Sequence, residues 1–237
     1  MAERFTSLGA GWLLPAVLSV TAGAVDIIGF LALGGLFTSH ITGNLVIVAA
    51  HYVTGRFSEV GPLLAVPMFV VVLGVVTLAS VMVGKEGNGL RRRLLILQAA
   101  LLVGSFGLGV GFGPFADADR PMPVLVGMLA VAAMATQNAL VKLAMKGAPS
   151  TAVMTTNTTQ LTIDLATIAR GRGELEELAK ARHRTMMTFP CVAGFVVGCT
   201  AGAVLEVRVG LWALALPVIL AALAVPLGEF RSDDVQS

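Results

Sequence analysis

Long apolar runs separated by short polar stretches dominate the chain. Six of these runs are long enough to cross about 30 Å of hydrocarbon as helices. The pattern therefore predicts an all-α membrane protein with six transmembrane helices. The predicted spans are residues 11–33, 62–83, 94–115, 124–143, 186–205 and 209–227.

Two further segments are weaker, and the positions of Lys and Arg decide how they are interpreted. Residues 41–54 form a short apolar run, and residues 151–169 carry seven Thr among other polar groups. If both segments crossed, the 16 basic residues would divide as seven inside and nine outside, against the positive-inside rule. If both enter and leave on one side, 13 lie inside and three, Arg56, Arg120 and Arg208, lie outside. We therefore expect two short broken or re-entrant polar helices beside six spans, with both termini in the cytoplasm.

The two polar segments also resemble each other. The chain reads T-S-H-I-T-G-N from Thr38 to Asn44, and T-A-V-M-T-T-N from Thr151 to Asn157, 113 residues later. Gly34 and Gly147 match at the same offset. With three spans in each half, the second half begins on the opposite side of the membrane from the first. The pattern therefore predicts an inverted 3+3 repeat.

One transmembrane domain over residues 1–237 accounts for the whole pattern. We expect the first repeat at about 11–83 and the second at about 122–205, with linking or closing helices at 94–115 and 209–227. The first apolar run is longer than a typical signal peptide core, so we expect it to be retained as a span.

Composition narrows the function classes. Hydrophobic residues make up 56% of the chain and charged residues 13%, as expected for a polytopic membrane protein. The net charge of +2 is too small to indicate a nucleic-acid partner. None of the common phosphate-binding, metalloprotease or serine hydrolase motifs occurs, so we expect neither an enzyme nor a bound cofactor.

Asp26 is the clearest functional candidate, because a carboxylate within an apolar span normally faces a cavity or a partner. Its counterpart in the second half, one residue out of register, is Asn138. Two interpretations remain open. Asp26 either handles a ligand or a proton, or it bonds the backbone that the break in the helix leaves free.

Helical spacing sorts the polar residues of the weak segments. Asn157, Gln160 and Asp164 share one face, and Asn44 and His51 share the same seven-residue relation. The offset that pairs the two Asn also pairs His51 with Asp164. Our hypothesis is that His51 or Asp164 changes protonation, because desolvation raises the pKa of a carboxyl. The alternative is that both residues lie at membrane boundaries without a chemical role.

Two other features are weaker guides. His40 lies in the first break, where it could ligate, hydrogen-bond or face the outer solution, but no second ligand at helical spacing indicates a metal site. Repeated G-x-x-x-G patterns in residues 107–113 and 194–202 indicate closely packed helices, within one chain or in a homo-oligomer.

One segment resembles a known family. Residues 21–44 contain an Asp in the first span, a Gly-Phe-small stretch, and an F-x-[ST]-x-x-T-G-N ending, and the T-x-x-M-T-T-N segment matches a second feature. The sequence resembles the YoaK family of uncharacterised multi-pass bacterial membrane proteins. The resemblance implies a bacterial inner-membrane protein and transfers no catalytic or binding residues. The matched positions are Asp26, Gly29, Phe37, Thr42, Gly43 and Asn44.

Together these patterns predict passage of a small solute or ion across the lipid bilayer. The sign of the solute stays open, because two helix N-termini favour an anion and Asp26 favours a cation. A channel and a proton-coupled exporter both fit. The alternative is a membrane scaffold whose polar motifs only brace broken helices. The expected path residues are Asp26, Thr42, Asn44, Asn138, Thr155, Asn157, Gln160 and Asp164.

Overall fold

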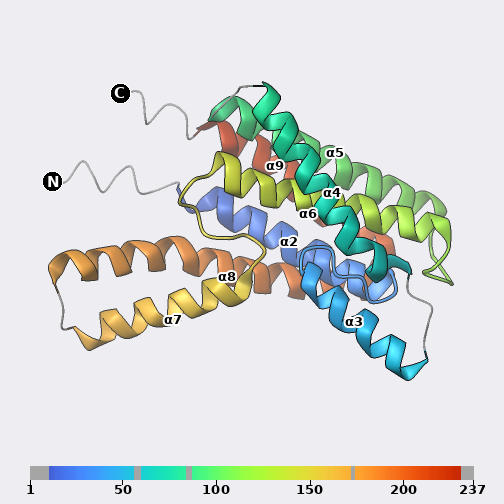
Figure 1. Ribbon diagram of the computed structural model, residues 1–237, viewed down its shortest axis with the longest axis horizontal. Helices are drawn as coiled ribbons and strands as arrows, with labels where there is room; N and C mark the ends of the chain where they lie inside the picture. The colour runs from blue at the N-terminus through green and yellow to red at the C-terminus, as the bar shows by residue number, and fades with distance from the viewer. Residues whose placement is uncertain (1–10, 56–59, 84–86, 172–173, 231–237) are drawn as a thin grey trace.

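The computed structural model describes residues 11–55, 60–83, 87–171 and 174–230, and every regular element in this part of the chain is a helix (Figure 1). The all-α expectation is confirmed. Backbone groups in hydrocarbon must be satisfied within their own segment, and apolar runs of this length satisfy them as helices. The elements are α2 (Leu13–Ala32), α3 (Ile41–Thr54), α4 (Val60–Val83), α5 (Asn88–Phe112), α6 (Pro121–Ala144), α7 (Met154–Arg170), α8 (Leu175–Val209), the short 3₁₀ helix η2 (Gly210–Leu214) and α9 (Ala215–Phe230).

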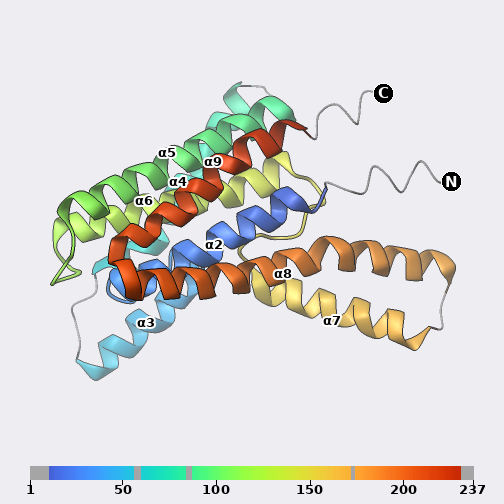
Figure 2. The same cartoon turned by 180° about the vertical axis from the view of Figure 1, so that it is seen from behind.

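By length and composition, five helical stretches among the described residues could cross a membrane. Four of them are α2, α4, α5 and α6, and the fifth runs from Leu175 to Glu229. The fifth contains both α8 and α9, and Figure 2 shows that the chain reverses direction at η2, between them. The protein is therefore a multi-pass membrane protein.

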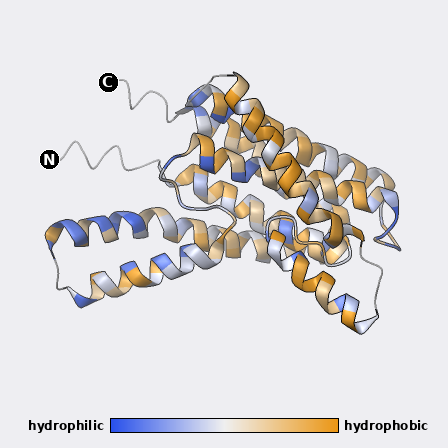
Figure 3. Cartoon of the chain, viewed as in Figure 1, coloured by the Kyte–Doolittle hydropathy of each residue, from blue (hydrophilic) through white to orange (hydrophobic). Residues whose placement is uncertain are grey.

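Helix α8 differs most from the sequence prediction, which limited it to residues 186–205. It is 35 residues long, roughly 52 Å at 1.5 Å per residue, and so exceeds the hydrocarbon thickness. Its charged first part stays helical because helix-forming residues continue, and the Lys180 ammonium lies 2.6 Å from the Glu176 carboxylate one turn earlier. With α7 it forms a hairpin whose hydrophilic end projects beyond the other helices (Figure 3).

The central helix is α2, whose side chains are mostly buried. Its backbone lies against α8 so closely that a Cβ at Gly198 would overlap the carbonyl oxygen of Val20. A Cβ at Gly23 would likewise overlap the Phe195 carbonyl oxygen. The Gly-rich face of α8 is therefore used inside the chain, as close helix packing requires. Gly107 of α5, by contrast, meets open space.

Helix contacts follow a regular scheme. Helix α2 packs on α8, and α6 packs on α4. In the same way α5 packs on α6, α9 packs on α2, and each short helix, α3 or α7, packs on the helix that follows it. Exchanging α2 with α6, α3 with α7, α4 with α8, and α5 with α9 leaves this scheme unchanged.

Figure 1 shows which segments lie at each end of the molecule. The left end contains the start of α2, the start of α5, the end of α9 and the turn between α7 and α8. The turn between α5 and α6 and the end of α3 lie at the right. Five of the basic residues used in the topology prediction lie outside the described residues: Arg4, Arg56, Lys85, Arg172 and Arg231.

Candidate functional site

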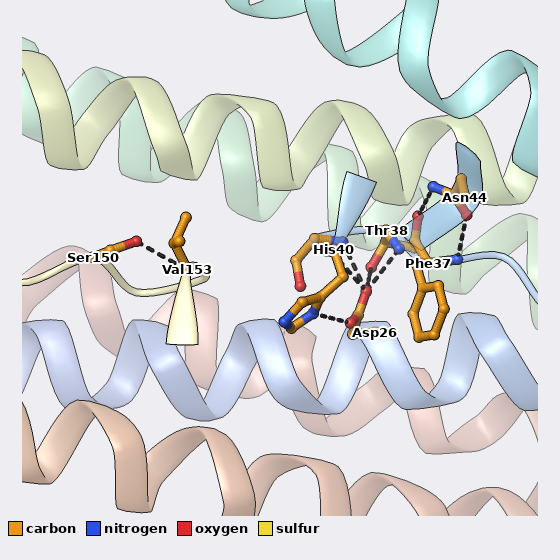
Figure 4. A network of polar contacts seen from close by, with 8 residues as sticks. Asp26, Phe37, Thr38, His40, Asn44, Ser150 and Val153 are labelled. Carbon is orange, nitrogen blue, oxygen red and sulfur yellow. Dashed lines mark hydrogen bonds and ion pairs between the residues drawn. The ribbon is translucent and has the colours of Figure 1, made fainter. Parts of the chain in front are cut away.

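The chain leaves α2 through a turn at Gly34 and Gly35, both with positive φ, and reaches α3 at Ile41. We call residues 33–40 the first break. Its centre is the Asp26 carboxylate, which is buried in α2 and faces the break (Figure 4). The backbone N–H groups of Thr38 and Ser39 each donate to Asp26 Oδ1 over 2.8 Å.

Asp26 satisfies the backbone that leads into α3. The bonded N–H groups of Thr38 and Ser39 precede the helix, and the His40 N–H lies 3.4 Å from the same Oδ1. His40 makes no side-chain capping bond to α3. A carboxylate just before a helix also stabilises the positive end of the helix dipole. His40 adds a side-chain contact, with Nδ1 2.6 Å from Asp26 Oδ2. Of the two interpretations left open for Asp26, bonding the free backbone describes this conformation.

Asn44 holds the same break from the other side. Its Oδ1 accepts the Phe37 N–H over 2.9 Å, and its Nδ2 donates to the Phe37 carbonyl over 2.7 Å. The side chain of Asn44 is completely buried. Only a group with a donor and an acceptor side by side can make both bonds, which explains an amide at this position.

Residues 145–153 form the second break, between α6 and α7, and it is held in the same way. Asn157 donates through Nδ2 to the Ser150 carbonyl, again seven residues earlier. The Ser150 hydroxyl accepts the Val153 N–H over 2.9 Å. Gln137 of α6 donates to the Thr151 hydroxyl over 2.9 Å, and the same Nε2 donates to the Leu18 carbonyl of α2.

Asn138, the predicted counterpart of Asp26, does not bond the second break. Asn138 donates to the Met134 carbonyl one turn earlier in its own helix. Gln137 makes the contact with the second break, because its direction of projection from α6 differs by about 100° from that of its neighbour. The two breaks also differ in charge, since Val153 takes the place of His40 and Gln137 replaces a carboxylate.

Gln98 is a further polar residue of this site that the sequence pattern did not predict. It is completely buried in α5, and its Nε2 lies 2.6 Å from Gln137 Oε1. The bond connects α5 to the second break through Gln137. An amide inside a predicted span could have drawn attention to Gln98, because polar groups in hydrocarbon need partners.

The structure also changes the interpretation of Asp164. Its buried carboxylate lies between α7 and α8, where the Arg184 guanidinium donates to it over 2.6 Å and Gln160 over 3.0 Å. The Arg184 guanidinium holds the pKa of this carboxyl below its usual value. This direction is opposite to the upward shift that the proton hypothesis assumed for Asp164, because the bonds from Arg184 outweigh the effect of burial. His51 lies in α3, which leads away from α7 in Figure 1.

Thr42 and Thr155 occupy equivalent positions in the first turns of α3 and α7, and both are exposed. Neither hydroxyl takes part in the bonds that hold the breaks. The expected path residues thus fall into two groups: buried or half-buried side chains that bond the chain itself, and two exposed threonines.

Comparisons with known proteins place this fold in a family. A family described as a protein of unknown function (DUF1275) matches residues 14–227. The "UPF0700 transmembrane protein YoaK" of Bacillus subtilis strain 168 is 30% identical over 142 residues, which are 58% of this chain and 60% of that relative. The chain thus covers less than two thirds of the relative's length, and no solved structure matches. The resemblance seen in residues 21–44 is confirmed, and the chain belongs to the YoaK family of transmembrane proteins, the DUF1275 proteins of unknown function.

Proposed function

We propose that the protein moves a small solute or ion across the bacterial inner membrane, with the two breaks as the equivalent moving parts of an inverted repeat. The observation that carries the proposal is the matched bracing of the breaks. Asn44 bonds the carbonyl of Phe37, and Asn157 bonds the carbonyl of Ser150 at the same offset. Two halves with equivalent broken helices are the usual architecture of alternating-access transporters.

The contact scheme supports the same arrangement. Apart from the contacts of η2, exchange of the two halves maps the main helix contacts onto one another or onto themselves, as an internal two-fold axis would. With α8 and α9 counted as separate crossings, the chain has six spans, three in each half: two in the repeat and one linking or closing helix. Repeat one is then α2 to α4, repeat two is α6 to α8, and α5 and α9 are the linking and closing helices.

The position of the breaks along α2 is also what a transport site requires. The second break is linked to α2 through Gln137, which bonds both Thr151 of the break and the Leu18 carbonyl, and the first break bonds α2 at Asp26. Leu18 and Asp26 are eight positions apart, roughly 12 Å along the helix, and they lie on opposite sides of its middle. Both breaks therefore approach the centre of the first span, one from each side.

The charges give the proposed orientation. By their position in the chain, nine of the described basic residues lie in the start of α5, at the end of α6 and in the hairpin of α7 and α8, and two lie just before α6 and at the end of α8. The start of α5 and the hairpin are at the left of Figure 1, and the turn before α6 is at the right. The positive-inside rule then places the left end in the cytoplasm, with the hairpin of α7 and α8 projecting there. The nine are Arg91, Arg92, Arg93, Lys142, Lys146, Arg170, Lys180, Arg182 and Arg184, and the two are Arg120 and Arg208.

A second candidate, a non-transporting membrane scaffold, is favoured by one observation. The polar side chains of both breaks bond the chain itself, as bracing alone would require. The two functions differ in the role that they predict for Thr42 and Thr155. Both residues are exposed, and their hydroxyls take no part in the bonds that hold the breaks. A transporter would use these hydroxyls to contact the solute, and a scaffold would not.

The exposed hydroxyls allow a direct test. Thr42→Val and Thr155→Val keep the side-chain shape and remove only the hydroxyl, so we expect wild-type thermal stability. A transporter should lose solute uptake in proteoliposomes with one or both variants, while a scaffold should be unaffected. The solute is first found by screening a deletion strain for altered sensitivity to small solutes. Asn44→Ala is the matched variant that should lower stability in either case.

A further inference from the structure

The two breaks are alike in geometry and unlike in ionisation. The first is held by a carboxylate and an imidazole, Asp26 and His40, with 2.6 Å between Oδ2 and Nδ1. The second is held by the neutral groups of Gln137, Thr151 and Ser150. A change in pH can therefore act on one break and leave its counterpart unchanged.

We propose that the Asp26–His40 pair is the proton-binding site of the transport cycle, and that proton release loosens the first break. The proposal rests on the proposed function and goes further, since it makes the protein proton-coupled and names the site. Binding adds one proton to the His40 imidazole and gives an imidazolium paired with the Asp26 carboxylate. Release returns the neutral ring, with no other bond made or broken.

Exposure of the pair suits a proton that enters and leaves. The Asp26 side chain is 5% exposed, whereas the His40 side chain is 39% exposed. Protons therefore reach the carboxylate through the imidazole. His40 also belongs to the break itself, one residue before α3, so its attachment to Asp26 bears directly on the position of that helix.

The surroundings of the pair contain few other titratable groups. From α8, the Phe195 ring lies 5.2 Å from the His40 ring, and the Cys199 thiol is within electrostatic reach of Asp26. From the first break, the Phe37 ring lies 6.2 Å from that of His40. On α3 itself, His51 is eleven residues further along, roughly 15 Å away. A single protonation step should therefore dominate.

The direction of the pH effect follows from the contact. The hydrogen bond to Asp26 raises the pKa of His40 above its usual value. Because the pKa is raised, the pair stabilises the observed conformation of the first break fully below about pH 6.5, which is the pKa of a free imidazole. This stabilisation disappears as the pH rises through the pKa of the paired ring. The neutral second break has no such dependence.

A nitroxide spin label can test the site without any solute. The reporter is Thr42→Cys in a chain with Cys191→Ala and Cys199→Ala, labelled and placed in lipid nanodiscs, and the matched control is Thr155→Cys in the same background. We expect the mobility of the label at position 42 to rise with pH along a one-proton curve with a midpoint above 6.5. The label at position 155 should not respond. Added His40→Gln, which keeps a polar side chain but cannot titrate, should abolish the response.

Each outcome decides something. A label at position 42 that ignores pH in the chain with His40 intact overturns the proton site, even if the His40→Gln variant fails to fold. A response that persists in His40→Gln also overturns it. Solute uptake into proteoliposomes, measured with and without a pH gradient, separates this inference from the proposed function. If the mobility of the label changes with pH but no solute is taken up, transport is refuted and the proton site remains. If solute is taken up but the label does not respond to pH, the proton site is refuted and transport remains.

Discussion

Replacing Asn44 with Ala should destabilise the protein by several kcal/mol. The change removes both hydrogen bonds to Phe37 and leaves the N–H and the carbonyl of that half-buried residue without these partners. An unsatisfied buried polar group costs about 1–3 kcal/mol, so the two together cost about 2–6 kcal/mol. Asn157 makes one such side-chain bond, to Ser150, and Asn157→Ala should therefore cost about half as much.

Thermal unfolding in detergent, followed with a thiol-reactive dye, measures this difference. Cys191 is buried in α8 and becomes reactive only when the helices separate. For a chain of this size, 1 kcal/mol corresponds to about 2–4 °C in Tm, so Asn44→Ala should lower Tm by roughly 10 °C. Asn138→Ala is the control, because its amide bonds a carbonyl within its own helix, and it should shift Tm by about 2 °C or less.

Two outcomes would refute the reasoning. If the Tm of Asn44→Ala equals that of the Asn138→Ala control, the two bonds to Phe37 contribute nothing to stability. If Asn157→Ala lowers Tm more than Asn44→Ala does, the number of bonds at each break does not set its strength. Asn44→Asp gives a further check, because a carboxylate keeps the acceptor but loses the donor, and it should not rescue the protein.

Two other predictions concern helix packing and charge. Gly198→Ala should lower Tm, because its Cβ would overlap the Val20 carbonyl oxygen and force α2 and α8 apart at a cost of about 1–3 kcal/mol. Gly107→Ala, which meets open space, should leave Tm unchanged or raise it, and equal losses in the two variants would contradict the packing argument. The lowered pKa of Asp164 means that its pair with Arg184 stabilises the fold above about pH 4 and less as the pH falls below it. Tm measured from pH 7 to pH 3.5 should therefore fall less steeply in Arg184→Ala than in the wild type, and parallel curves would show that the pair has no role.

The apolar pattern by itself determined much of this protein. It predicted the membrane class, the helical fold and the bounds of α3, because a long continuous apolar run can satisfy its backbone groups in lipid as a helix. The repeated T-x-x-x-T-x-N pattern predicted that Asn44 and Asn157 would be equivalent, and both bond a carbonyl seven residues earlier. The family followed from the residues around Asp26.

The tertiary structure decided which side chains meet. Arg184 reaches Asp164 from another helix, and Gln137 rather than Asn138 faces the second break. Such contacts depend on the rotation and separation of two helices, which are set by packing across the whole bundle. Hydropathy in the sequence reports how long a helix is and what surrounds it. It does not report the direction in which a neighbouring helix presents its side chains, and that direction decides whether a buried carboxylate binds a backbone amide, an imidazole or a guanidinium.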